Sequence, residues 1–221
     1  MVLKINGDIV SNDLKEVYEW FGLECSCPKD VHDALDTLPE GDRLEIKINS
    51  YGGYVDAGKE IYTTLRDRGD VDIDVESIAA SAASMIAMAG RSTISPVGML
   101  MIHDVSACGV SGNRHDMKKM AEDLAQYDAS IAEAYAEKTG MEVDAVMKLM
   151  DKETYLPAQR AVELGFIDAI SEAKTTAKTN GIGGVQVTDE MIEEFKAAKA
   201  AEAQKEATKK ELLNDLEDFG I

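Results

Sequence analysis

Positive charge, histidine and cysteine are all scarce in this chain of 221 residues. Each scarcity argues against one class of binding partner or site. Lysine and arginine total 23 against 42 acidic residues, which gives a formal net charge of −19. Such acidity disfavours binding to nucleic acid or to an anionic membrane surface. Three cysteines with few nearby histidines make a poor zinc site. The sequence therefore predicts an enzyme or binding protein that needs neither a metal nor a cofactor.

Long apolar runs are also missing. No segment reaches the roughly 18 uninterrupted apolar residues of a membrane-spanning helix, and the opening MVLKINGD does not resemble a signal peptide. The cysteines, at positions 25, 27 and 108, are odd in number, and the first two are too close in sequence for an ordinary disulfide. We therefore expect reduced thiols and a soluble, cytoplasmic protein.

The chain does contain an alternation of strand-like and helix-like segments. Apolar runs and polar–apolar alternation predict strands at 2–5, 43–49, 71–75, 98–103 and 165–168. Helical spacing of apolar residues predicts helices at 12–21, from 28 to about 38, and at 55–66, 82–89, 113–138, 143–150 and 157–164. Strands alternating with helices in this order predict an α/β fold with a largely parallel sheet.

A change of composition after Ser171 predicts three parts. Residues 1–172 form the globular domain, and 173–187, rich in Lys, Thr and Gly, form a linker. Residues 188–221 form a charged tail that is helical or disordered. The long helix predicted at 113–138 would project from a small domain unless something packs against it, so an interface helix and an internal packing helix are equally good interpretations.

A serine in an alanine-rich stretch is the strongest chemical signal. The segment SIAASAASMIAMAG (77–90) sets Ser84 near the start of a predicted helix, among small neighbours that let a substrate backbone approach. A helix N-terminus offers a favourable dipole and free amides, which makes the amide of Met85 a candidate oxyanion donor. Gly53, in the pair Gly52–Gly53 directly after a strand, is the candidate for the second donor, although an ordinary turn also explains the pair.

His103 is the candidate base. It ends an apolar predicted strand, at the sheet edge where sites gather. His32 and His115 lie on polar faces of predicted helices, which is typical of surface residues. A lone histidine at a strand end is more often structural, and the pairing with Ser84 is what favours catalysis. The carboxylate that would orient His103 stays open among four residues: Asp104, Asp151, Glu153 and Asp168.

These motifs, in this order, resemble the ClpP family of self-compartmentalising serine proteases. The resemblance rests on NSYGGYVDAG (49–58), AASM (82–85), MIH (101–103) and AVELGFID (161–168), and it covers about residues 2–171. It implies a catalytic triad of Ser84, His103 and Glu153, with the amides of Gly53 and Met85 as the oxyanion hole. Glu153 stands where the family has aspartate, so Asp151 is kept as the alternative third member.

Several departures narrow the resemblance. Tyr51 replaces the family's proline, and Ser81 is interpreted as a spacer before the AAS motif. The chain opens directly into its first strand, without the family segment that helps to dock an unfoldase, and it carries an additional tail. This combination resembles the ClpP-like head maturation proteases of tailed bacteriophages, which act inside a prohead on scaffold and capsid proteins. It implies a ClpP/crotonase-like spiral of ββα units and a ring-forming homo-oligomer in the host cytoplasm, with helix 113–138 as the ring-to-ring contact.

The predicted activity is therefore that of a serine endopeptidase working through an acyl-enzyme, as an ATP-independent prohead protease. The main alternative is an ATPase-coupled housekeeping ClpP-type subunit. A crotonase-like acyl-CoA enzyme would share the spiral fold and the paired amides but would not need the serine and histidine. A catalytically inactive assembly subunit would keep the fold alone.

Overall fold

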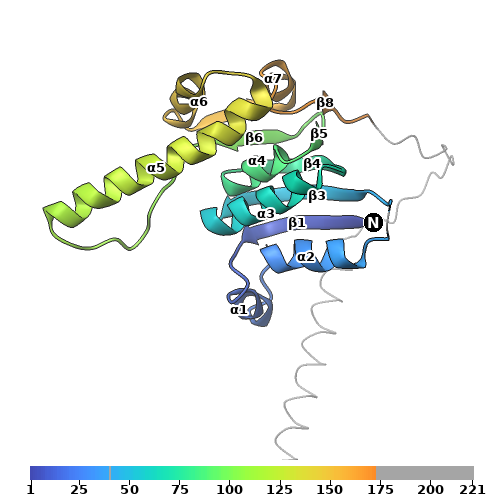
Figure 1. Ribbon diagram of the computed structural model, residues 1–221, viewed down its shortest axis with the longest axis horizontal. Coiled ribbons are helices and arrows are strands. Elements are labelled where there is room, and N and C mark those ends of the chain that lie inside the picture. Colours follow the sequence, from blue (N-terminus) through green and yellow to red (C-terminus); the bar gives the residue numbers. More distant parts are fainter. Residues whose placement is uncertain (40, 173–221) are drawn as a thin grey trace, which may run out of the picture. The chain divides into compact units, whose positions relative to one another are not determined.

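The computed structural model describes residues 1–39 and 41–172 (Figure 1). The described residues all belong to one compact unit, Met1–Ala173. The predicted linker at 173–187 and the predicted tail at 188–221 lie outside the described residues.

The described residues form one eight-stranded, largely parallel sheet. Its order is β2-β1-β3-β4-β5-β8, all parallel, and β6 pairs in parallel with the end of β4 and antiparallel with β7. The strands are β1 (Val2–Ile9), β2 (Cys25–Ser26), β3 (Leu44–Gly53), β4 (Val71–Ala80), β5 (Arg91–Ile94), β6 (Met99–Ile102), β7 (Thr154–Pro157) and β8 (Ala169–Ile170). The predicted α/β class with a parallel sheet is confirmed.

Helices connect the strands, and the core lies between them and the sheet. They are α1 (Lys15–Trp20), α2 (Pro28–Thr37), α3 (Val55–Arg68), α4 (Ala82–Ala87), α5 (Arg114–Thr139), α6 (Val143–Met150) and α7 (Ala158–Glu163). The alternating positions of β3 that are apolar (Leu44, Ile46 and Ile48) are fully buried and belong to the same cluster as Ile61 and Leu65 of α3. This burial fixes which face of the sheet α3 covers.

Two central strands run further than predicted. β3 continues past residue 49 to Gly53, and β4 continues past residue 75 to Ala80. Their extensions are held by pairing that sequence alternation does not reveal, between Ser50 and Ala79 and between Ile78 and Met99. β4 therefore ends directly before Ser81, the one residue that separates it from α4.

Other differences are smaller. β2, β5 and β7 were not predicted. The strand expected at 165–168 is a turn after α7, and the edge strand β8 follows it. Short edge strands carry too few residues for a period to be recognised.

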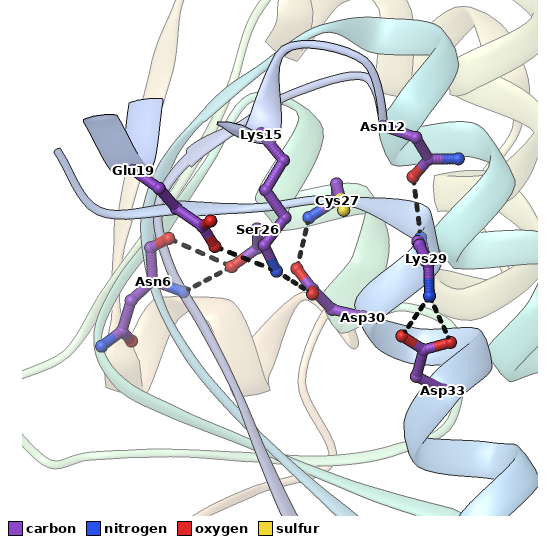
Figure 2. A network of polar contacts seen from close by, with 9 residues as sticks. All are labelled: Asn6, Asn12, Lys15, Glu19, Ser26, Cys27, Lys29, Asp30 and Asp33. Atoms are coloured by element: carbon purple, nitrogen blue, oxygen red, sulfur yellow. Dashed lines mark hydrogen bonds and ion pairs between the residues drawn. The ribbon is translucent and has the colours of Figure 1, made fainter. Parts of the chain in front are cut away.

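Polar contacts, rather than an apolar face, hold the segment between β1 and α2 (Figure 2). Lys15 forms an ion pair with Asp30, which also accepts a hydrogen bond from the Cys27 amide at 2.9 Å. The side chain of Asn12 accepts a hydrogen bond from the Lys29 amide at 2.9 Å. The apolar stripe predicted for helix 12–21 does not pack inward, since α1 has no buried residue and Trp20 is 80% exposed.

All three cysteines are free thiols. Burial raises the pKa of both Cys25 and Cys27, which keeps these thiols protonated near neutral pH. Among the described residues, no helix combines the length and the apolar character that crossing a membrane would require.

Helix α5 has two different halves. At its start the side chains of Asn113 and Asp116 cap each other's backbone amides, and at its end Gly140 adopts φ 72°. Its buried residues, Ile131, Ala132, Ala134 and Tyr135, all lie in the second half. The second half therefore packs internally, while the first half projects beyond the sheet (Figure 1).

Candidate active site

The junction of β4 and α4 is a strained elbow at Ser81. Its backbone has φ 53° and ψ −127°, a conformation that residues other than glycine rarely adopt. The Ser81 amide donates to the Met101 carbonyl at 3.0 Å, and the Ser81 carbonyl accepts from the Ser84 amide at 2.9 Å. Strain of this kind costs about 1–3 kcal/mol and is concentrated at functional sites.

Ser81 opens onto a small cavity of about 50 Å³. His103, which follows β6, and Gly53, which ends β3, line the same cavity. The cavity thus gathers residues from the carboxyl ends of three strands, where sites in α/β sheets form. The rest of its lining is mainly apolar and comprises Val55, Ala82, Met85, Val105, Ser106, Ile131 and Tyr135.

Ser84 does not line this cavity. It is 0% exposed, and its hydroxyl lies 2.6 Å from the Ser81 carbonyl oxygen and 2.7 Å from the Tyr135 hydroxyl oxygen. The predicted accessibility of the Ser84 hydroxyl is wrong. The physical reason is helical geometry: α4 begins at Ala82, so Ser84 lies within its first turn and points back into the protein.

The predicted amide donor Met85 is also engaged elsewhere. Its amide donates to the Ser81 carbonyl at 3.4 Å in the first turn of α4, although Met85 is among the residues that line the cavity. The first amide of a helix has no partner within the helix, and in α4 that amide belongs to Ala82. Ala82 also lines the cavity.

The glycine pair lies against the elbow. Gly52 has φ 100°, and a Cβ atom added there would be 2.7 Å from both the Ala80 carbonyl oxygen and Ser81 Cβ. Only glycine fits such a position. Two residues after Gly52, the amide of Tyr54 donates to the Ile9 carbonyl in β1 at 2.8 Å. Gly53, between Gly52 and Tyr54, lines the cavity.

The end of the β6–β7 ladder adjoins both His103 and Glu153. Ile102 and Thr154 form the last pair of this antiparallel ladder; His103 directly follows Ile102, and Glu153 directly precedes Thr154. Glu153 is exposed and has φ 49°. No hydrogen bond joins the His103 ring to a carboxylate within residues 1–39 and 41–172.

The remaining candidate carboxylates fall in two places. Burial, followed by the negative charges of Asp128 and Asp151, raises the pKa of Asp104, while nearby His103 lowers it. Asp151 therefore lies near Asp104, the residue that follows His103 in the chain. Asp168 instead accepts hydrogen bonds at 2.7 Å from the Ser92 amide and from Lys138.

In the described part of the chain, no three His, Cys, Asp or Glu side chains are grouped to bind a metal ion.

Several cavity residues were not identified from the sequence. Val105, Ser106 and Ile131 carried no chemical signal. By helical spacing, Tyr135 falls on the apolar face of the helix predicted at 113–138. A tyrosine at a buried position needs a partner for its hydroxyl, and that requirement was the available signal.

Comparison with known proteins gives the family. The family described as Clp protease matches residues 32–174, a range that includes every residue of the cavity. The chain is 36% identical over 146 residues to the ATP-dependent Clp protease proteolytic subunit 2 of Nocardia farcinica (strain IFM 10152), covering 64% of this chain and 70% of that protein. It is 29% identical over 174 residues to the ATP-dependent Clp protease proteolytic subunit 1 of Chlamydia pneumoniae, covering 74% and 91%. With its parallel sheet and helices, this chain belongs to the Clp protease family of serine peptidases.

Proposed function

We propose that this chain is a ClpP-type serine endopeptidase in which Ser81, rather than Ser84, is the nucleophile and His103 is the base. The observation that carries the proposal is that Ser81, His103 and Gly53 line one cavity while the Ser84 side chain is fully buried. A serine on a strained strand-to-helix elbow has its hydroxyl held clear of the sheet, where a peptide can reach it.

The reaction follows from these positions. Ser81 Oγ attacks the carbonyl carbon of the scissile peptide bond while His103 takes its proton. The tetrahedral intermediate collapses, His103 gives the proton to the leaving amine, and an acyl-enzyme remains. Water, deprotonated by His103, then attacks the ester, and His103 returns the proton to Ser81 Oγ as the acid is released. The apolar cavity lining beside Ser81 favours substrates with an apolar side chain before the cleaved bond.

The amides of Gly53 and Ala82 are the proposed oxyanion hole. Both residues line the cavity, and Ala82 contributes the first amide of α4. A helix N-terminus also stabilises negative charge near it. Ala82, directly after the proposed nucleophile, thus replaces Met85 as the candidate oxyanion donor.

Glu153 is the proposed third member of the triad. Its support is the β6–β7 ladder, whose last pair, Ile102 with Thr154, directly adjoins both His103 and Glu153. Asp151 is the alternative, because it lies near Asp104 beside the histidine. A carboxylate in either position would hold the imidazole in the productive tautomer.

One experiment tests these assignments together: intact-mass analysis after exposure to a fluorophosphonate probe, compared among variants. We expect a single adduct that is lost in Ser81→Ala and kept in Ser84→Ala, with both variants folded by circular dichroism. Glu153→Gln should slow labelling by orders of magnitude, up to about 10⁴-fold, and Asp151→Asn should have little effect. An adduct that survives in Ser81→Ala and disappears in Ser84→Ala would overturn the assignment, and the reverse order of the two carboxylate variants would exchange their roles.

For the biological role we propose an ATP-independent head maturation protease of a tailed bacteriophage, acting on scaffold and capsid proteins as a ring-forming homo-oligomer. Its support is the combination of Tyr51 in place of proline with a segment, 175–221, beyond the region that the Clp protease family matches. The two relatives, both named as proteolytic subunits of ATP-dependent Clp proteases, favour an ATPase-coupled subunit instead. Cleavage of a scaffold protein without ATP or unfoldase is the expected result, and a strict need for both would favour the alternative.

A further inference from the structure

A buried chain of hydroxyl groups lies behind the elbow. Ser84 Oγ is 2.6 Å from the Ser81 carbonyl oxygen and 2.7 Å from the Tyr135 hydroxyl oxygen. Ser84 is 0% exposed and Tyr135 is 1% exposed. A carbonyl oxygen can only accept, so the single hydrogen of the Ser84 hydroxyl is donated to it. The Tyr135 hydroxyl must then donate to Ser84 Oγ, and successive bonds of this kind strengthen one another in a buried site.

This chain ends on the peptide group that carries the proposed oxyanion donor. The Ser81 carbonyl and the Ala82 amide belong to one planar trans peptide, so they point in opposite directions. Holding the carbonyl toward the interior of α4 turns the amide outward. Ala82 N lies on the side of Gly52, where a Cβ added to that glycine would be only 3.0 Å away, and Ala82 lines the cavity.

We infer that Ser84 and Tyr135 are positioning residues for catalysis: their relay, from α5 through α4, orients the Ser81–Ala82 peptide so that the Ala82 amide meets the oxyanion. This inference rests on the proposed function of Ser81. Neither hydroxyl reaches the reacting atoms, because Ser84 is buried and the hydroxyl of Tyr135 is bound to Ser84.

Simple satisfaction of polar groups does not account for the relay. The Ser81 carbonyl already accepts a hydrogen bond from the Ser84 amide at 2.9 Å and a longer one from the Met85 amide at 3.4 Å. The hydroxyl therefore adds a third donor to a carbonyl that has its helical partners. A peptide at a backbone φ of 53° gains from such a restraint, because a strained conformation persists only where its surroundings fix it.

The test measures kcat and KM on a peptide substrate, together with inhibition by a peptide aldehyde, which forms a tetrahedral adduct carrying the same oxyanion. Ser84→Ala should lower kcat by about 10- to 100-fold, somewhat less than the roughly 10²–10³-fold cost of deleting an oxyanion donor. KM should change by less than about twofold, and aldehyde affinity should fall in parallel with kcat. Tyr135→Phe should lower kcat by about 3- to 10-fold, and the double variant should match Ser84→Ala, since the two hydroxyls act in series.

Matched controls distinguish the loss of the relay from the loss of any other serine or tyrosine hydroxyl. Ser92→Ala removes another fully buried serine hydroxyl, from β5. Tyr127→Phe removes a hydroxyl from α5 that donates to the Asp56 carboxylate at 3.4 Å. Both should keep kcat. Tyr135→Phe keeps the aromatic ring, whose centroid lies 5.8 Å from that of Phe166. This variant therefore tests the relay even if Ser84→Ala does not fold.

Two results would overturn the relay: kcat within about twofold of the controls in both variants, whatever their melting temperatures, or a raised KM with kcat unchanged. Ser81→Ala tells this failure from failure of the proposed function. If Ser81→Ala is inactive while Tyr135→Phe keeps the wild-type kcat, only the relay is wrong. If Ser81→Ala retains turnover, both the relay and the proposed role of Ser81 are wrong.

Discussion

At the scale of single residues, Asp168 shows how one carboxylate joins three elements. Its Oδ2 atom accepts hydrogen bonds at 2.7 Å from the Ser92 amide in β5 and from Lys138 Nζ at the end of α5. Lys138 also donates to the Gly90 carbonyl at 2.9 Å. Burial opposes ionisation of the Asp168 carboxyl, but these hydrogen bonds and the lysine charge more than offset it and lower the pKa of Asp168. Folding therefore favours the ionised form.

This pKa shift predicts a pH dependence of stability. The folded state holds the Asp168 proton less readily than the unfolded chain, so the contribution is complete above the unfolded value of 3.8 and is lost as the pH falls through the lower folded value. Asp168→Asn should cost about 1 kcal/mol near pH 7, a modest figure because the pair is partly exposed, and nothing once the wild-type carboxyl is protonated. Urea unfolding across this range measures it, with exposed Asp36→Asn as the control. A cost that stays constant with pH would contradict the linkage.

At the scale of elements, β4 and α4 show what the sequence could and could not predict. Val71, Ile73 and Val75 alternate with acidic residues, and this pattern predicted the first half of β4. The second half, Glu76–Ala80, is a strand because β6 and the end of β3 pair with it, and no local pattern reports such long-range pairing. The beginning of α4 at Ala82 was nevertheless predicted.

The choice between Ser81 and Ser84 follows from that missed extension. The two serines are three positions apart, so helical periodicity places them on the same face and cannot tell them apart. What separates them is the backbone: Ser81 is the only residue between strand and helix, and its φ of 53° belongs to no regular element. His103 and Gly53 follow from strand ends alone, and both line the cavity. The contact of Ser84 with Tyr135 spans 51 positions, and only the fold brings them together.

At the scale of the whole molecule, the first half of α5 carries a stripe of apolar side chains that the domain leaves at least partly exposed. Met117, Met120 and Leu124 recur at helical spacing on this half, which contains no buried residue. Met117 is 39% exposed. An apolar stripe on a projecting helix is typical of an interface, and the Clp protease family forms rings, so we interpret this stripe as a contact between copies of the chain.

Leu124→Asp should therefore lower the mass of the assembly. A carboxylate there would have to lose its hydration at the interface without a partner, in a chain whose net charge of −19 already repels a second copy. Gln126→Asp adds the same charge on the opposite face of α5 and should leave the mass unchanged. Sedimentation velocity at about 0.15 M salt, where the Debye length is roughly 8 Å, keeps long-range repulsion screened. Equal dissociation of both variants would mean that charge alone disrupts assembly, and an intact Leu124→Asp assembly would place the interface elsewhere.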